Sequence, residues 1–233
     1  MTSPVPAPAP VLVAVAHGTS SAAGRSAIGS LVAAVAARRP DLTVRAAFVD
    51  VQPPDPAAVL SSLHDDAPAR LVPLLLSAGY HVYVDLAEAA ERVPGTTVAP
   101  ALGPDDRLAD LLRDRLVAAG LRDDDAVVLG AAGSSQASAV ADCERVAAAL
   151  GRRLGRTVVA GYLSAAEPKL ADAVAAQRVP GRRVVVATYL LAPGFFADLA
   201  GRSGADVVTP PLLLPHEPAP EALVDVVVER YLS

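Results

Sequence analysis

Residues 11–24, VLVAVAHGTSSAAG, decide the fold that the rest of the chain is expected to follow. The first six of them form a continuous apolar run, which is typical of a parallel strand covered on both faces. A tight turn follows at Gly18, and a helical pattern begins near Ala22. This order places His17 at the carboxyl end of the strand, where open α/β sheets bind their ligands.

The composition indicates a folded protein with a large aliphatic core. The 233 residues are 52% hydrophobic and only 3% aromatic, so Ala, Val and Leu must fill the interior. The net charge of −5 argues against nucleic acid as a partner, because nonspecific binding relies on Lys and Arg. The single cysteine, Cys143, excludes an internal disulfide and favours a reducing compartment. No apolar run reaches the roughly 18–20 residues of a membrane span, so we expect a cytoplasmic protein without a membrane partner.

Apolar and turn-forming segments alternate along the chain in the order expected of an α/β protein with parallel sheets. Residues 1–10 are rich in Pro and Ala and lack the segments of a signal peptide, so we expect a disordered leader. Strands are predicted at 11–16, 42–49, 70–76, 96–99, 126–131, 157–163, 183–191 and 206–208, and helices at 22–39, 57–65, 82–92, 105–119, 137–154, 167–177, 197–202 and 220–232.

The second half of the chain repeats landmarks of the first at an offset of 114 or 115 residues. The corresponding pairs are Gly18-Thr19-Ser20 with Gly133-Ser134-Ser135, Phe48-Val49-Asp50 with Tyr162-Leu163-Ser164, and Gly79-Tyr80-His81 with Gly194-Phe195-Phe196. A fourth pair, Asp85-Leu86 with Asp198-Leu199, has an offset of 113. Two unrelated α/β domains would share the alternation, but they have no reason to keep a near-constant offset. We therefore infer an internal duplication and expect two similar flavodoxin-like (Rossmann-like) domains at 11–122 and 123–233, each with strand order 2-1-3-4.

Two histidines follow strands that this order makes neighbours. His17 ends the first strand and His81 lies in the loop after the third, so the two imidazoles could meet at one metal ion. The second half has Ala132 and Phe196 in the corresponding places. Histidines that the fold itself required should recur there. Their absence favours a chemical role confined to the first half over a purely structural one.

Other motifs carry less information. The sequence contains no GxGxxG, no GxxxxGK[ST] and no GxSxG. Ala16 precedes His17 where a histidine phosphatase would have Arg, so a phosphatase with a histidine nucleophile is disfavoured. His64 and His216 stand at the end of a helix and in a Pro-rich loop, and we expect both at the surface.

Two stretches carry a resemblance to a known family. They are Ala16-His17-Gly18-Thr19 after an apolar strand and the longer, more specific residues 72–86, VPLLLSAGYHVYVDL. These resemble the signatures of the sirohydrochlorin chelatases of the CbiX/SirB type (class II chelatases), roughly A-H-G-S and P-L-x-L-x-x-G-x-H-x-x-x-D-I-P. The resemblance covers essentially the whole chain, including its doubled architecture.

The resemblance implies two Rossmann-like domains facing across a cleft and a lyase that inserts Fe²⁺ or Co²⁺ into sirohydrochlorin without ATP or an organic cofactor. It also implies that His17 and His81 are the metal-binding and catalytic residues, with the second half as the opposing wall. The chain departs from the pattern at Thr19, where Ser is common, at Asp85-Leu86-Ala87 in place of D-I-P, and at Asp50 in place of Glu. The roles of Asp50 and Asp85 stay open.

The residue types fit that chemistry. Imidazole is a suitable ligand for iron and cobalt, and an open two-histidine site can release an ion that a closed four-ligand site would keep. Insertion displaces two pyrrole protons, and a neutral histidine can accept one; which histidine is ligand and which is base stays open. The substrate is a flat macrocycle edged with carboxylates, which backbone N–H groups at helix starts can bind. Residues expected to contact it are Thr19, Ser20, Ser21, Tyr80, Ser134, Ser135 and Phe195, with Leu76 and Phe196 as further apolar walls.

One rival function uses the same cleft: a non-catalytic carrier of metal or tetrapyrrole. The sequence also leaves open whether the metal is iron, for siroheme, or cobalt, for cobalamin. The oligomeric state is open as well, although a monomer suffices if the duplication supplies both facing halves.

Overall fold

The structure, a computed structural model, describes residues 9–63, 67–77 and 80–233, with the backbone alone at residues 80–83. Eight strands and eight helices alternate along the described residues, as predicted. The strands are β1 (Val11–Ala16), β2 (Val44–Phe48), β3 (Ala69–Pro73), β4 (Thr97–Val98), β5 (Ala126–Ala131), β6 (Val158–Tyr162), β7 (Val184–Tyr189) and β8 (Val207–Val208). The helices are α1 (Ala22–Arg38), α2 (Pro56–Ser61), α3 (Tyr80–Glu91), α4 (Asp106–Ala118), α5 (Ala137–Leu154), α6 (Leu170–Ala176), α7 (Phe195–Ala200) and α8 (Glu221–Leu232).

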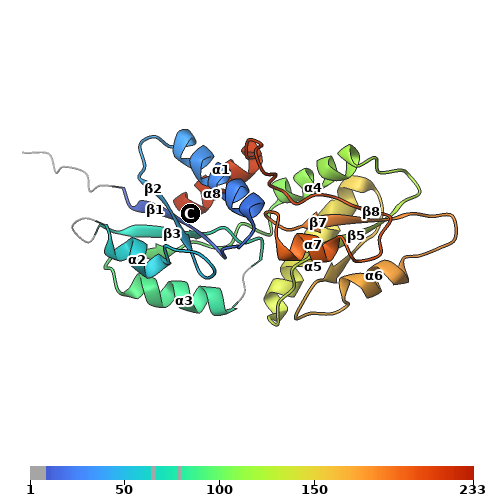
Figure 1. The fold of residues 1–233 in the computed structure, drawn as a ribbon, viewed down its shortest axis with the longest axis horizontal. Helices are drawn as coiled ribbons and strands as arrows, with labels where there is room; N and C mark the ends of the chain where they lie inside the picture. Colours follow the sequence, from blue (N-terminus) through green and yellow to red (C-terminus); the bar gives the residue numbers. More distant parts are fainter. Residues whose placement is uncertain (1–8, 64–66, 78–79) are drawn as a thin grey trace, which may run out of the picture.

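Two separate four-stranded parallel sheets form two lobes that lie side by side (Figure 1). Their strand orders are β2-β1-β3-β4 and β6-β5-β7-β8, so the predicted order 2-1-3-4 is confirmed in both. In each sheet the first strand of the lobe lies in the middle, paired in parallel with the second and third strands. The carboxyl ends of β1 and β3 are therefore neighbours. No helix in the described ranges is long and apolar enough to span a bilayer.

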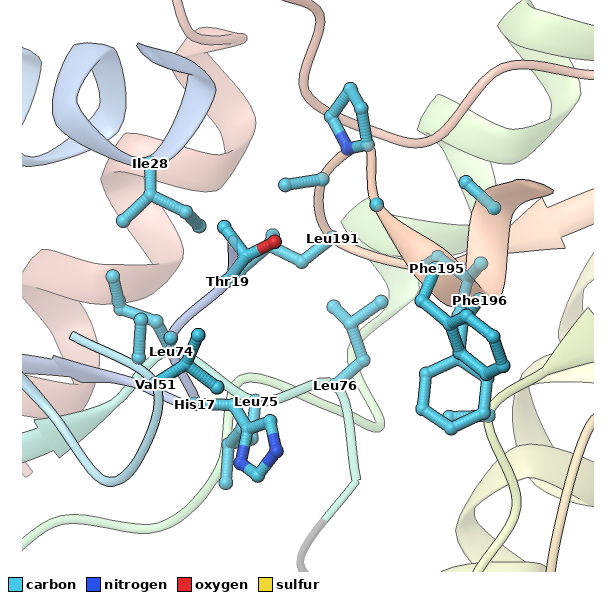
Figure 2. A pocket seen from close by; sticks show the side chains of 18 of the residues that line it. His17, Thr19, Ile28, Val51, Leu74, Leu75, Leu76, Leu191, Phe195 and Phe196 are labelled. Atoms are coloured by element: carbon cyan, nitrogen blue, oxygen red, sulfur yellow. The ribbon is translucent and has the colours of Figure 1, made fainter. Parts of the chain in front are cut away.

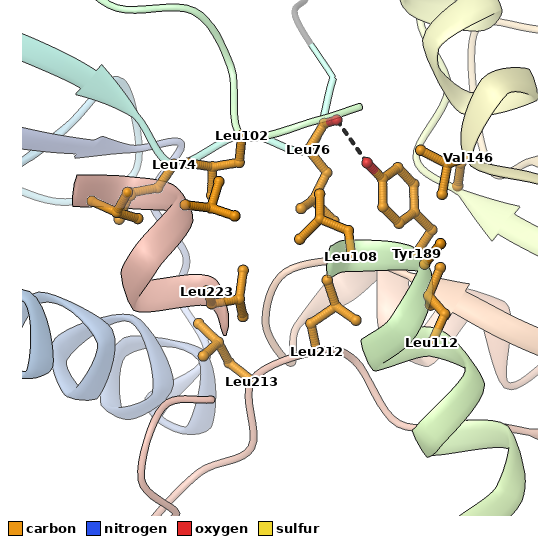
Figure 3. Packing of buried hydrophobic residues seen from close by; sticks show 14 of the residues in the cluster. Leu74, Leu76, Leu102, Leu108, Leu112, Val146, Tyr189, Leu212, Leu213 and Leu223 are labelled. Atoms are coloured by element: carbon orange, nitrogen blue, oxygen red, sulfur yellow. Dashed lines mark hydrogen bonds between the residues drawn. The ribbon is translucent and has the colours of Figure 1, made fainter. Parts of the chain in front are cut away.

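The side-chain alternation of the central strands divides the hydrophobic core. In β1, Val11, Val13 and Val15 pack with α2 and α3 on one face of the first sheet, whereas Leu12, Ala14 and Ala16 face the other way. β5 divides in the same manner, with one face packed against α6 and α7. The remaining faces of both sheets join in one continuous cluster, which crosses between the lobes (Figure 3). The two lobes thus share a core instead of meeting at a surface contact.

The last helix of each predicted domain packs on the other lobe. α4, although it falls in the range 11–122, contacts α5 and β7 of the second lobe. α8, from the range 123–233, contacts α1 and β3 of the first lobe (Figure 1). The predicted ranges therefore each contain one sheet, but they do not coincide with the two packed lobes. The predicted leader falls mainly on residues outside the described part, and its last residue, Pro10, accepts a hydrogen bond from the Tyr231 hydroxyl at 2.7 Å.

The duplicated turns match closely in their hydrogen bonds. In the first half the Asp50 N–H donates to the His17 carbonyl at 2.9 Å, and in the second the Ser164 N–H donates to the Ala132 carbonyl at 2.9 Å. The glycines that follow, Gly18 and Gly133, have φ of +98° and +90°. This agreement supports the inferred duplication and shows that the turn holding His17 persists in the second half without its imidazole.

Some predicted boundaries are wrong by a few residues. β3 ends at Pro73 instead of residue 76, because Leu75 and Leu76 turn their carbonyls toward other partners. α3 begins at Tyr80 instead of residue 82, so the His81 backbone lies in the first turn of a helix and not in a loop. α7 shows the same two-residue difference, since it begins at Phe195 with Gly194 as its N-cap.

Candidate functional site

A cleft of about 420 Å³ opens between the lobes at the carboxyl ends of β1, β3 and β7 (Figure 2). Its described lining is largely apolar and contains no Asp, Glu, Lys or Arg. Residues from the first lobe include His17, Leu75 and Leu76, and residues from the second include Leu191 and Phe195. Such a site suits a large ligand with an apolar face.

His17 stands at the end of β1, and its exposed imidazole lies beside Leu75 at the cleft (Figure 2). Its position is fixed by the backbone, because its carbonyl accepts the Asp50 N–H. Within the described residues no group of three or more His, Cys, Asp or Glu side chains is arranged to hold a metal ion. His17 is therefore the described imidazole that a ligand entering the cleft meets.

The loop after His17 is held by side chains of its own lobe. The Thr19 N–H donates to Gln52 Oε1 at 3.0 Å, and the Ser21 N–H donates to Thr19 Oγ1 at 3.1 Å. The Ser21 hydroxyl caps α1 by accepting the Gly24 N–H at 3.2 Å, as predicted for a helix cap. The exposed Arg25 guanidinium donates to the Ser20 carbonyl at 2.8 Å. The N–H groups of Thr19 and Ser21 thus already donate within the lobe, so fewer N–H groups of this turn are available to bind a substrate carboxylate.

The opposite wall of the cleft comes from the β7–α7 connection. Phe195 and Phe196 open α7 with their rings edge to face, 5.7 Å between centroids, and both line the cleft (Figure 2). The lobes come very close at one end of the cleft, where a Cβ on Gly24 would lie 2.4 Å from the Pro193 carbonyl oxygen. The cleft is an apolar slot with the aromatic pair on one side and the His17 turn on the other.

A buried hydrogen bond joins the two lobes at the base of the cleft. The Tyr189 hydroxyl, from the end of β7, donates to the Leu76 carbonyl of the first lobe at 3.0 Å (Figure 3). Burial raises the pKa of Tyr189 well above its ordinary value. Cys143 on α5 also lines the cleft, and burial raises the pKa of its thiol to about 11, a rise that a hydrogen bond with Ser77 opposes. Both groups therefore stay protonated at neutral pH.

Comparison with known proteins assigns the chain to a family. A family model described as CbiX matches residues 11–119 and 126–199. The chain belongs to the CbiX family. No curated protein matches this CbiX-family chain at a significant level.

Solved structures share the fold of this CbiX-family protein over nearly its full length. SirB from Bacillus subtilis with Fe³⁺ has a TM-score of 0.75 and 20% identity, with 96% of each chain covered. The sirohydrochlorin chelatase SirB from Bacillus subtilis subspecies spizizenii in complex with cobalt has a TM-score of 0.75 and 17% identity, again with 96% of each chain covered. CbiX, described as the terminal enzyme for biosynthesis of siroheme in denitrifying bacteria, has a TM-score of 0.71 and 21% identity, over 96% of this chain and 100% of that one. The predicted duplicated chelatase-like fold is confirmed.

Within the CbiX-family fold, the predicted site residues fall into three groups. His17, Thr19, Ser20, Leu76, Phe195 and Phe196 line the cleft. The side chains of Tyr80 and His81 lie outside the described residues, as does His64, so the pairing of His17 with His81 stays a prediction. In the described lining, Ala131 and Ala132 represent the second turn, whereas Ser134 and Ser135 do not take part. Ser134 instead accepts the Gln136 N–H at 3.1 Å. His216 is exposed, as expected.

Sequence reasoning about this CbiX-family chain missed Val51, Gln52 and Tyr189, which all line the cleft. Val51 and Gln52 follow β2, and Tyr189 ends β7, so the rule that sites gather at the carboxyl ends of strands could have found them. The carboxylate of Asp50 is exposed and accepts the Val51 N–H at 2.7 Å, which gives it a role in the turn.

Proposed function

We propose that this CbiX-family protein is a sirohydrochlorin chelatase, a lyase-type enzyme that inserts Fe²⁺ or Co²⁺ into the tetrapyrrole. The observation that carries the proposal is His17, held at the end of β1 and open to an apolar slot between two lobes. Family membership and the likeness in fold to SirB structures with iron and with cobalt support it.

The lining residues have properties that such a reaction needs. A macrocycle with an apolar face is stabilised by burial against Leu76, Phe195 and Phe196. The metal ion is a substrate that must be held and then given up, which suits one or two imidazoles better than a closed ligand set. Since Cys143 and Tyr189 stay protonated, His17 is the described lining residue suited to accept a pyrrole proton.

In this proposal His81 is the second imidazole, and the second lobe supplies the opposing wall. Thr19 and Ser20, which line the cleft, remain the proposed contacts for the substrate carboxylates, whereas Ser21, Ser134 and Ser135 lie outside the described lining. In this proposal the reaction takes no organic cofactor and occurs in the cytoplasm. One chain supplies both walls of the cleft, so a monomer suffices, and the oligomeric state stays open. The ranges 11–122 and 123–233 remain the proposed products of the duplication.

The test is metal insertion by variants that lack one imidazole. His17→Ala and His81→Ala should each lower the rate of insertion by about 10²-fold or more, because a proton acceptor or metal ligand is lost. The matched control is His216→Ala, which removes an exposed histidine outside the cleft and should leave the rate unchanged. The rate is followed by the absorbance change of sirohydrochlorin with Co²⁺ or, without oxygen, Fe²⁺. Full activity of either cleft variant would refute the assignment.

The same assay separates an enzyme from a carrier. With protein at a small molar fraction of sirohydrochlorin, a chelatase converts many equivalents, whereas a carrier stops at one equivalent per chain. Comparing the rates with Fe²⁺ and Co²⁺ at equal free concentrations then identifies the preferred metal.

A further inference from the structure

We propose that Val51 is a substrate-contact residue, which packs against one side of the flat tetrapyrrole while Phe195 of the other lobe contacts the opposite side. This inference rests on the proposed function. It assigns a part in substrate specificity to Val51, in addition to the roles of the histidines and of the aromatic wall. Val51 follows β2 in the first lobe and lines the cleft near His17 (Figure 2).

The first observation is the location of exposed apolar side chains. Five large hydrophobic residues of the described chain are exposed, and two of them line the cleft. These two are Val51, 57% exposed, and Phe195, 75% exposed, one from each lobe. Apolar side chains gathered at a concave site mark a surface that binds an apolar ligand. The pair therefore gives each side of the slot an apolar contact.

The second observation is the backbone of Val51, which has φ of +67°. A β-branched residue in the left-handed region is strained, and glycine would adopt this conformation more easily. The duplicated turn has Ala165 at the equivalent place, with φ of +51°. Both halves thus need this conformation, but the half that carries His17 holds a larger, strained side chain there. Strain that folding does not require points to a function of the side chain.

The third observation is how firmly the turn is held. The Val51 N–H donates to Asp50 Oδ1 at 2.7 Å, and the next residue, Gln52, accepts the Thr19 N–H. The Asp50 N–H in turn donates to the carbonyl of His17. Val51 is therefore fixed relative to His17, so a ring resting on its methyl groups is held in register with the imidazole.

The experiment separates contact from strain with three variants. Val51→Thr keeps the shape and the strain but replaces a methyl group with a hydroxyl. Val51→Gly removes both the side chain and the strain. The matched control, Ala165→Gly, relieves the equivalent turn at an exposed residue that does not line the described cleft.

We expect KM for sirohydrochlorin, and the Kd of the metal-free tetrapyrrole measured by its fluorescence, to rise about five- to tenfold in Val51→Thr and Val51→Gly. The Tm should rise by about 2–4 °C in Val51→Gly and Ala165→Gly and stay unchanged in Val51→Thr. Ala165→Gly should keep the wild-type KM, and Co²⁺ binding without tetrapyrrole should be the same in all four proteins.

A KM and Kd of Val51→Thr within twofold of wild type would overturn the inference, even if Val51→Gly gained stability. So would an equal rise of KM in Ala165→Gly. Failure of the proposed function is a different outcome, because the wild-type protein would then insert no metal at all.

Discussion

The turn that presents His17 requires a residue without a side chain at position 18. Gly18 has φ of +98°, and a Cβ there would lie 1.9 Å from the Asp50 carbonyl oxygen. Gly133 repeats this geometry, with φ of +90°, and a Cβ on it would lie 1.9 Å from the Ser164 carbonyl oxygen. The close approach of two backbones, and not the histidine, explains why glycine stands in both halves.

Gly18→Ala should lower the free energy of unfolding by at least about 2 kcal/mol, because the turn must open to relieve the contact. Gly133→Ala is the matched control and should cost a similar amount. Urea unfolding measures the stability, and metal insertion at a temperature where both variants are folded measures the activity. We expect the rate to fall much further in Gly18→Ala, since only that turn carries His17. Equal losses of rate would contradict this account.

At the scale of elements, α4 and α8 are joined by a cluster of charged side chains. Asp105 caps α4 by accepting the Arg107 N–H at 3.0 Å, and it pairs with the side chains of Arg107 at 2.8 Å and Arg230 of α8 at 3.3 Å. Arg107 also pairs with Glu229 of α8. Burial by itself would raise the pKa of Asp105, but the hydrogen bonds and charges of these arginines hold it below its usual value.

Asp105→Asn should lower the free energy of unfolding at pH 7 by about 1–3 kcal/mol, because it keeps the cap but removes the charge that both arginines bind. Since the folded-state pKa lies below that of the unfolded chain, the wild-type carboxylate stabilises the fold above about pH 4 and loses this effect as the pH falls further. The difference between the two proteins should therefore shrink below about pH 4. Chemical unfolding at several pH values measures it.

The control for this variant is Asp114→Asn, which removes the charge of a carboxylate that is 64% exposed and paired with Arg113. Its effect should stay within about 0.5 kcal/mol at every pH, as for exposed ion pairs in general. A pH-independent loss of stability in Asp105→Asn would show that the carboxylate charge has no part in joining the helices.

How far these elements could be predicted depends on how local their causes are. The runs at β1 and β5 are apolar throughout, so these segments could be predicted as buried parallel strands. The strand order 2-1-3-4 then followed from the flavodoxin-like alternation of strands and helices. The starts of α3 and α7 were placed two residues late, because aromatic residues after glycine also fit a turn. The exchange of α4 and α8 was not predictable, since periodicity shows that a helix has an apolar face but not which sheet it covers.

The site residues divide in the same way, into those with a local signal in the sequence and those without one. His17 was found because it ends a predicted strand, and Phe195 because it occupies the place of Tyr80 in the repeat. Val51 and Tyr189 were missed, because their roles depend on a turn conformation and on contact with the other lobe. Their places after β2 and at the end of β7 point to the cleft, but a turn conformation and a contact between lobes leave no pattern within one segment of the sequence.

At the scale of the whole molecule, the exchanged helices make each lobe depend on the other half of the chain. Leu108 and Leu112 of α4 are fully buried in the cluster that also contains Leu223 of α8 (Figure 3). Separated halves would expose one side of their sheet to water. The duplication therefore produced one cooperative unit instead of two independent domains.

Fragments 1–122 and 123–233 should each fail to fold alone and should form a complex when expressed together. Circular dichroism and size-exclusion chromatography would measure this, with fragment 123–217, which lacks α8, as the control that should not rescue 1–122. Cooperative unfolding of 1–122 by itself would show that the exchanged helix is dispensable for the first lobe.

The bond between Tyr189 and the Leu76 carbonyl has a consequence for which molecules can enter. Moving the lobes apart would break this buried hydrogen bond, which costs free energy even before any leucine is exposed. The bond therefore resists any change in the distance between the two lobes. A ligand that binds in the cleft must therefore fit the existing separation of the lobes, because a wider separation would break this bond.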